Sequence, residues 1–423
     1  MNEHVRKMAD QVREWLGLHQ HQLIHHYFFR EVDDFHQTVY TLTTEWVPDH
    51  AELPDDGSNP AGTAVVDINF HTGAVQRIVF VHNTNSADSE VYPTPDPKEY
   101  VIEWIEDLTG LTFGRQFLIA REHDHSITFH AAVDNIPVSP GGTIEVSFND
   151  NGELTLFSID GHFPSEEHIQ WEPFALTPDK YEPVALEQCH LVELPDQAQE
   201  KWLPVFGIEE TFITNDAERT IPFQMGADKQ SFVAKDEVMR WSTPMTGTWK
   251  PGDMDLSPDV SVETARANKP HPDTIPLTEA EVAACEREVL RFMRLVYPKE
   301  SGKRKWTGVY LQDGYIIAEI QRIGDQVANE LDVKIKVVIE RETCTAINYF
   351  DQEALYGAFQ HFDQADDAVV SRDDAVAYLR PYLQMDPMYV YDSEEDHYIM
   401  CGKLDCAYGV DAVTGDVIRL NTL

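Results

Sequence analysis

Apolar residues recur at helical spacing in several stretches of the chain, and each stretch begins with residues that cap helices. In residues 2–17 the apolar positions form one stripe, as in an amphipathic helix that packs one face on a core. Residues 96–108 open on Asp96-Pro97, which suits an N-cap followed by a first-turn proline. We predict helices at 2–17, at 96–108, from Thr177-Pro178, from Thr278 with a capping box to Glu281, and from Ser371.

The segments that follow these helices alternate apolar and polar residues, which is the pattern of half-buried antiparallel strands. Several of the alternating segments are joined by turns in which a glycine follows Asp, Asn or Thr, a residue order that suits a tight hairpin. We find this turn in "INFHTGAVQRI", "SFNDNGELTLF" and "VDAVTGDVIRL", with Asp313-Gly314 as a further hairpin signal. In "IERETCTAINY" Cys344 stands where glycine is expected, and "FITNDAERTIPF" is a weaker copy.

These patterns together predict an α+β protein made of tandem units, each a helix packed on an antiparallel sheet. We expect two such units in residues 1–165, a partial third in 166–225 and two further units in 276–423. Residues 226–275 are dense in Pro, Gly and Asp and are expected to form a connector between the halves.

The stretch "FHAAVDNIPVSPGGTIEVSFNDNGELTLFS", Phe129 to Ser158, resembles the repeats of the YcdB/YcdC type, which are related to PepSY domains and to the propeptide modules of thermolysin-like proteases. The matching elements are "NIPV", the glycine at 142 and "NDNGELTLF"; "YGVDAVTGDVIRL" resembles the closing hairpin of the same family, and "KWLPVFGIEETFITNDAERTIPF" is a looser match. The resemblance implies a bacterial helix-and-sheet module without catalytic residues. It also implies a role in modulating a peptidase, because the propeptide relatives chaperone or inhibit one.

The charge of the chain narrows the choice of partners. With 74 acidic and 32 basic residues the net charge is −42, which disfavours nucleic acid and anionic membranes as partners. The acidic surface fits a saline or alkaline habitat, and it also fits a cationic partner or bound divalent cations. The N-terminal residues have no apolar signal-peptide region, and five cysteines do not suggest a disulfide framework. We therefore expect a cytoplasmic protein with reduced thiols.

The sequence contains few candidates for catalytic or metal-binding residues. The motifs HExxH, GxSxG, Walker A and GxGxxG are all missing from the sequence. His123 and His125 are two residues apart, so on a strand they would share a face and could bind a metal ion. A structural role fits the remaining candidates better than metal binding; these are Cys401, Cys406, His19, His21, His25 and His26. The acidic runs lack the order of EF-hand ligands.

The sequence favours a non-catalytic binding or regulatory protein that needs no cofactor and takes a peptide or protein, for example by strand addition at a sheet edge. Trp241 and Trp249 in the connector are candidate anchors for a partner, and they would equally serve to pin the connector to its own domain. Two alternatives remain open. One is a metal-dependent enzyme that uses His123 and His125, and the other is a self-associating structural protein, a homo-oligomer.

Overall fold

The computed structural model describes residues 2–223, 231–256, 258–323, 334–352, 359 and 361–420. The chain divides into two compact units. Unit 1 contains Met1–Gln170, Ser257–Thr274 and Tyr389–Ile399, and unit 2 contains Trp171–Leu256, Ile275–Met388 and Met400–Leu423. The domain limits expected from the sequence stay a prediction, and the limit at 225 lies outside the described residues. Among the described residues, no helix combines the length and the apolar character needed to cross a membrane.

The predicted helices are all present, and polar side chains cap several of them. They are α1 (Glu3–Trp15), α2 (Lys98–Thr109), α3 (Pro178–Glu187), α5 (Glu279–Val296) and α6 (Arg372–Leu379). The Asn2 side chain accepts a hydrogen bond from the backbone N–H of His4, and Thr278 forms a capping box with Glu281. Thr278 therefore marks a helix start as predicted, because its side chain satisfies an N–H group that has no partner inside the helix. Helix α2 begins one residue later than predicted, with Pro97 rather than Asp96 at its N-cap and without a side-chain cap.

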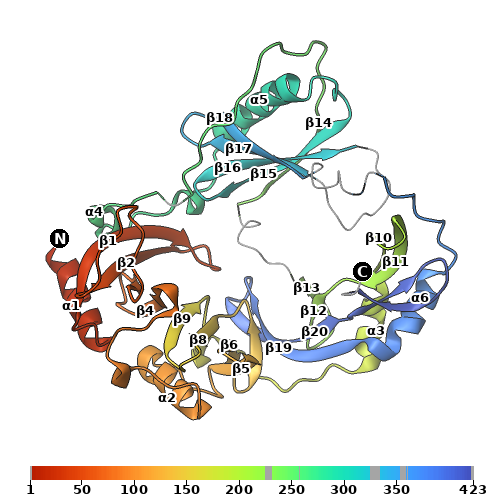
Figure 1. Ribbon diagram of the computed structural model, residues 1–423. Coiled ribbons are helices and arrows are strands. Elements are labelled where there is room, and N and C mark those ends of the chain that lie inside the picture. The colour runs from red at the N-terminus through yellow and green to blue at the C-terminus, as the bar shows by residue number, and fades with distance from the viewer. Residues whose placement is uncertain are drawn as a thin grey trace. The chain divides into compact units, whose positions relative to one another are not determined.

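Unit 1 is built on one large antiparallel sheet. Its strands are β1 (His21–Val32), β2 (Thr38–Pro48), β3 (Ala64–Asn69), β4 (Val75–Phe80), β5 (Phe117–His123), β6 (Ser126–Val133), β7 (Ile136–Ser139), β8 (Thr143–Phe148) and β9 (Leu154–Asp160). They hydrogen-bond in the order β1-β2-β3-β4-β9-β8-β6, and β5 and β7 both pair with β6. Helices α1 and α2 lie on the same side of these strands (Figure 1). Their buried residues, including Val5, Val12, Val101 and Ile105, join one core with the strands.

Unit 2 contains three antiparallel ladders. The strands are β10 (Cys189–Asp196), β11 (Lys201–Ile208), β12 (Thr211–Thr214), β13 (Thr220–Pro222), β14 (Val233–Val238), β15 (Arg304–Gln312), β16 (Tyr315–Arg322), β17 (Lys334–Glu340), β18 (Thr345–Asp351), β19 (Gln384–Asp392), β20 (His397–Asp405), β21 (Tyr408–Asp411) and β22 (Val417–Arg419), and the division from unit 1 falls within β19 and β20. The ladders run β14-β15-β16-β17-β18, β10-β11-β21-β22 and β13-β12-β20. Helix α5 covers one face of the first ladder and shares its core (Figure 1).

The expected fold class, α+β with tandem units that each consist of a helix packed on an antiparallel sheet, is wrong. The protein is mostly β, and strands from different expected units pair with one another in large mixed sheets. Residues Arg77–Val79 of β4 pair with Leu156–Ser158 of β9, so the first two expected units share one sheet. Strand β11 pairs with β21, which joins the expected third and last units, and β7 pairs in parallel with Tyr389 and Val390 of β19. The physical reason is that a small sheet leaves unpaired backbone groups at its edges, and neighbouring strands satisfy them.

The predicted hairpin turns are confirmed. Gly73, Gly152 and Gly415 close the β3–β4, β8–β9 and β21–β22 turns, each with a φ between +75° and +81°. Cys344 takes the same left-handed region in the β17–β18 turn, with φ +50°. At Gly73 a Cβ would meet nothing within 4 Å, so there the backbone conformation alone favours glycine.

The described residues of the connector belong to both units. It contributes β14 to the five-stranded ladder of unit 2 and the short helix α4 (Val262–Arg266) to unit 1. Ala265 is fully buried in the unit 1 core, and the N–H of Val260 donates to the carbonyl of Phe28 on β1. The hydroxyl of Tyr40 on β2 donates to the carbonyl of Lys269 at 2.5 Å. The segment therefore covers part of the β1 edge, which a strand partner would otherwise occupy.

Candidate functional site

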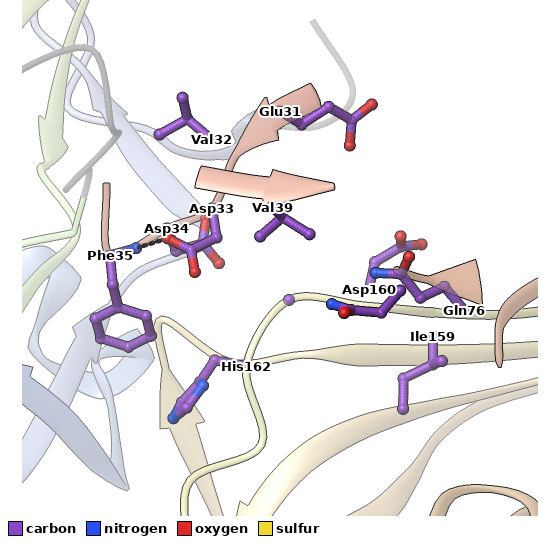
Figure 2. Close-up of a pocket in the computed structure, with 12 residues that line it drawn as sticks. Glu31, Val32, Asp33, Asp34, Phe35, Val39, Gln76, Ile159, Asp160 and His162 are labelled. Atoms are coloured by element: carbon purple, nitrogen blue, oxygen red, sulfur yellow. Dashed lines mark hydrogen bonds between the residues drawn. The ribbon is translucent and has the colours of Figure 1, made fainter. Parts of the chain in front are cut away.

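A pocket of about 380 Å³ lies in unit 1, where the β1–β2 turn, the β3–β4 turn and the end of β9 come together (Figure 2). Ligand sites are usually a few hundred Å³ in volume. The acidic side chains at this pocket are those of Glu31, Asp33, Asp34 and Asp160, and the apolar ones are those of Val32, Phe35, Val39 and Ile159. Asn69, Gln76, Gly161 and His162 complete the lining. In Figure 2, Asp34, Phe35 and His162 lie on one side of the pocket, and Gln76, Ile159 and Asp160 lie on the other.

Local hydrogen bonds fix the turns that carry these side chains. The Asp33 carboxylate accepts the backbone N–H groups of Phe35 and Gln37 at 3.0 and 2.7 Å, which sets the β1–β2 turn. The Asn69 side chain accepts the N–H groups of His71 and Thr72 in the β3–β4 turn in the same way. Short polar side chains at the start of a turn often stabilise it like this. Among the described contacts, the carboxylates of Asp34 and Asp160 accept no hydrogen bond that stabilises a turn. Their charges are therefore available to a ligand.

The end of β9 is shaped by a glycine in close contact with the neighbouring strand connection. Gly161 has φ +76°, and a Cβ there would lie 2.9 Å from the Cα of Gly142. The carbonyl of His162 accepts the N–H of Gly142 at 2.6 Å. Both the conformation and the space therefore require glycine at 161, and the result is a fixed position for His162.

Aromatic contacts hold the His162 side of the pocket. The Phe35 ring makes edge-to-face contacts with the rings of His162 and Tyr391 at 4.6 and 4.9 Å, and His162 stacks on Tyr398 at 6.2 Å. Burial lowers the pKa of His162, with a further contribution from His168. The negative charges of Asp33 and Asp34 oppose this shift. His162 is therefore a neutral polar group at pH 7 rather than a counter-ion for the carboxylates.

Two carboxylates on this face of the sheet have raised pKa values. Desolvation by the surrounding strands raises the pKa of Glu31, and the charges of Asp67 and Asp160 raise it further. Burial raises the pKa of Asp67 and the charge of Asp160 adds to the rise, whereas the 2.6 Å hydrogen bond from Thr43 and the positive charge of Arg77 act against it. Like charges disfavour ionisation of their neighbours, so a positive group placed among them would be stabilised.

The composition of the lining limits what this pocket can do. It contains no Ser, Thr, Cys or Tyr that could act as a nucleophile, and no Lys or Arg that could balance the carboxylates. A lining of carboxylates and apolar side chains is suited to a cationic group on an apolar stem, such as a lysine or arginine side chain.

The structure places His123 and His125 differently from the sequence prediction. His123 is the last residue of β5, whereas His125 lies in the turn to β6, so the two do not share a strand face. Both are exposed, and the Nε2 atom of His125 is 3.6 Å from a carboxylate oxygen of Asp150. Within the part of the chain that the structure describes, no group of three or more His, Cys, Asp or Glu is arranged to hold a metal ion. A metal held by these two histidines stays a prediction.

The other histidines and cysteines named from the sequence have local roles. His19, His25 and His26 are exposed. His21 is buried, and its Nε2 atom is 3.1 Å from the hydroxyl of Ser86. Cys401 and Cys406 are both buried, which confirms their expected packing role.

The two connector tryptophans lie against unit 2. The Trp249 ring makes edge-to-face contacts with Phe292 of α5 and Tyr349 of β18 at 5.2 and 5.3 Å. The indole N–H of Trp241 donates to the carbonyl of Pro298 at 3.2 Å. These contacts favour the interpretation in which the tryptophans pin the connector to its own domain, and their use as partner anchors stays a prediction.

Sequence reasoning missed the acidic pocket. The signal for one side of it was the pair Asp33-Asp34 in a short turn between two alternating segments. Such pairs are common in solvated turns, and nothing in the sequence connects this one with Asp160, more than a hundred residues away. The sheet pairing of β4 with β9 brings the two parts together.

Comparison with known proteins identifies no family. No family model matches the chain, and no curated protein matches it. Among solved structures, the *Bacillus megaterium* YpeB C-terminal domain matches over 53% of this chain and 98% of that domain, with a TM-score of 0.27 and 15% sequence identity. A likeness this weak supports no argument about this chain, so the YcdB/YcdC resemblance stays a prediction.

Proposed function

We propose that this chain is a non-catalytic binding protein whose unit 1 pocket receives a basic side chain of a peptide or protein partner. The observation that carries the proposal is the lining of the pocket, in which four carboxylates and four apolar side chains occur without any Lys or Arg. The acidic chain as a whole, with a net charge of −42, would attract a basic partner at long range.

The pocket and its charges support a side chain as the ligand. A volume of about 380 Å³ suits one long side chain together with some of its backbone. Val39 and Ile159 offer apolar surface to the methylene groups, while Asp34 and Asp160 are placed to accept hydrogen bonds from the charged end. Binding of a cation would also relieve the repulsion that raises the pKa values of Glu31 and Asp67.

Binding of fluorescein-labelled peptides to the full chain tests this function. One peptide carries a central lysine and its partner carries norleucine, which has the same apolar stem without the charge. We expect the lysine peptide to bind at least about tenfold more tightly, and we expect Asp34→Asn/Asp160→Asn to abolish this difference, because hydrogen bonds to charged groups contribute about 1.5–3 kcal/mol each.

The control variant is Glu52→Gln/Asp55→Asn, which removes the same charge from exposed positions of unit 1 outside the pocket. It should keep the preference for lysine. Equal binding of both peptides to the unchanged protein would refute the proposal, and so would an equal loss of binding in the pocket and control variants.

A further inference from the structure

The β17–β18 turn of unit 2 carries a cysteine where the backbone favours glycine. Cys344 has φ +50°, in the left-handed region that Gly73, Gly152 and Gly415 occupy in the other hairpins. A residue with a Cβ is destabilised there by about 1–2 kcal/mol. An unfavourable conformation that persists in a turn points to a use for the side chain.

The turn that carries Cys344 packs on a helix that carries a second cysteine. Cys285 lies on α5 and is fully buried, and the nearby Cys344 is one of the groups that raise its pKa. Cys344 itself is partly exposed, and its thiol donates to the carbonyl of Arg341 at 3.6 Å. One thiol therefore faces the core and the other is within reach of solvent.

The turn is tied to α5 on both sides of this pair. The Nε atom of Arg341 is 2.9 Å from Oε1 of Glu281, which is four residues before Cys285 on the helix. The N–H of Ala346 donates to Oε1 of Glu288, three residues after Cys285, at 3.0 Å. Residues at these spacings share one helix face, so the turn holds Cys344 over Cys285 from two directions.

We propose that Cys285 and Cys344 form a reversible redox site that closes to a disulfide when the protein meets hydrogen peroxide. Cys344 reacts first. Its sulfur attacks one peroxide oxygen, an S–O bond forms, the O–O bond breaks, and the leaving hydroxide takes the proton of the Cys344 thiol to become water. The Cys285 sulfur then attacks the sulfur of the Cys344 sulfenic acid, the S–S bond forms, and the S–O bond breaks to release a second water. Two thiols are oxidised, and both oxygens of one peroxide are reduced.

The environments of the two thiols set their order of reaction. Burial raises the pKa of Cys285 to about 12, and the nearby Cys344, Glu281 and Glu288 contribute to the rise. Cys285 is therefore a protonated, shielded thiol that an oxidant does not reach directly, and it serves as the resolving partner. The proton of the Cys285 thiol combines with the hydroxide released from Cys344 and forms water. A thiol reductant reopens the disulfide by exchange.

Mass spectrometry of the full chain tests this site. The protein is treated with hydrogen peroxide, blocked with N-ethylmaleimide and digested with trypsin without reduction. We expect the peptide that ends at Arg287 to be joined to the peptide that begins at Glu342, with the loss of two hydrogen atoms, and dithiothreitol should separate them. The linked protein should melt roughly 5–10 °C higher, because the disulfide closes a long loop.

Two further samples keep the result interpretable. Cys344→Gly suits the left-handed turn, so it should fold, melt no lower than the reduced parent protein, and show no rise in melting temperature after oxidation. The buried pair Cys189 and Cys406 in the unchanged protein is the internal comparison, and it should stay reduced. The proposal is overturned if the linked peptide is absent and Cys344 becomes a sulfinic acid, or if Cys189 and Cys406 link as readily.

Discussion

The β3–β4 turn of unit 1 and the β17–β18 turn of unit 2 are built alike and used differently. Both are tight hairpin turns with one residue in the left-handed region. In unit 1 that residue is Gly73, with open space where a side chain would be, and the turn ends beside the acidic pocket. In unit 2 it is Cys344, and hydrogen bonds of Arg341 to Glu281 and of Ala346 to Glu288 hold its turn on α5. The same type of hairpin turn therefore borders a pocket in unit 1 and packs on a helix in unit 2.

The carboxylates near the two turns differ in the same way. Beside the β17–β18 turn, hydrogen bonds from Arg341 and Thr278 hold the pKa of Glu281 down to about 2. Beside the β3–β4 turn, burial and the charge of Asp160 raise the pKa of Asp67. A carboxylate that is stabilised as an ion supports the fold, whereas carboxylates that repel one another around a hollow favour a cationic ligand. Glu281 in unit 2 and Asp67 in unit 1 therefore differ in the direction of their pKa shifts.

The largest expected effect is the loss of the ion pair in unit 2. Glu281→Ala should lower the free energy of unfolding by about 2 kcal/mol at pH 7, because it removes both the capping box and the partner of Arg341. A folded pKa below the unfolded value means that this stability is present above about pH 4.5 and is lost as the pH falls toward about 2. Urea titrations at several pH values measure it. Glu279→Ala, in the same helical turn but exposed, is the control and should change little.

The next largest effect on stability is expected from a substitution in the β3–β4 turn of unit 1. Gly73→Ala should destabilise unit 1 by about 1 kcal/mol, because alanine disfavours a φ of +75° although its Cβ has room. Hydrogen exchange should rise in β3 and β4 and stay unchanged in β17 and β18. Unchanged exchange in β3 and β4 would contradict the role given to this glycine.

A smaller effect of opposite sign is expected at Asp67. Asp67→Asn keeps an acceptor for the Thr43 hydroxyl and removes a charge whose pKa is raised. A folded pKa above the unfolded value means that the stability contributed by Asp67 is present at low pH and is lost as the pH rises through the folded pKa. The variant should therefore be more stable than the parent protein by about 0.5 kcal/mol at pH 7 and equal to it near pH 3. Thermal melts at both pH values decide this.

The smallest effect concerns Cys344 in the reduced protein. Cys344→Gly removes the left-handed strain but also a packed thiol, and it adds backbone entropy to the unfolded chain, so the net gain should be no more than about 0.5 kcal/mol. Denaturant titration in excess reductant measures it. A loss of 1 kcal/mol or more would mean that thiol packing, rather than redox chemistry, explains the cysteine at this position.

Local features of the fold were open to prediction because their causes are local. The capping box of Thr278 and Glu281 and the N-cap at Ser371 act within one helical turn, so they marked helix starts correctly. The order of residues in a tight turn also acts over a few positions, which is why Gly73 and Gly152 were identified as hairpin turns. The expected fold class of tandem helix-on-sheet units was wrong, because strands far apart in the sequence, such as β4 with β9 and β11 with β21, pair in large sheets.

The amino-acid order was sufficient for the helices, the hairpins and the acidic character of this protein, since capping, turn conformation and charge depend on neighbouring residues or on composition alone. Strand pairing between distant segments settled the rest. It placed distant segments in shared sheets and brought Asp34 and Asp160 to one pocket. Edge strands can satisfy their backbone groups with many partners, so the partner is selected by the packing of the whole core, which no single stretch of sequence contains.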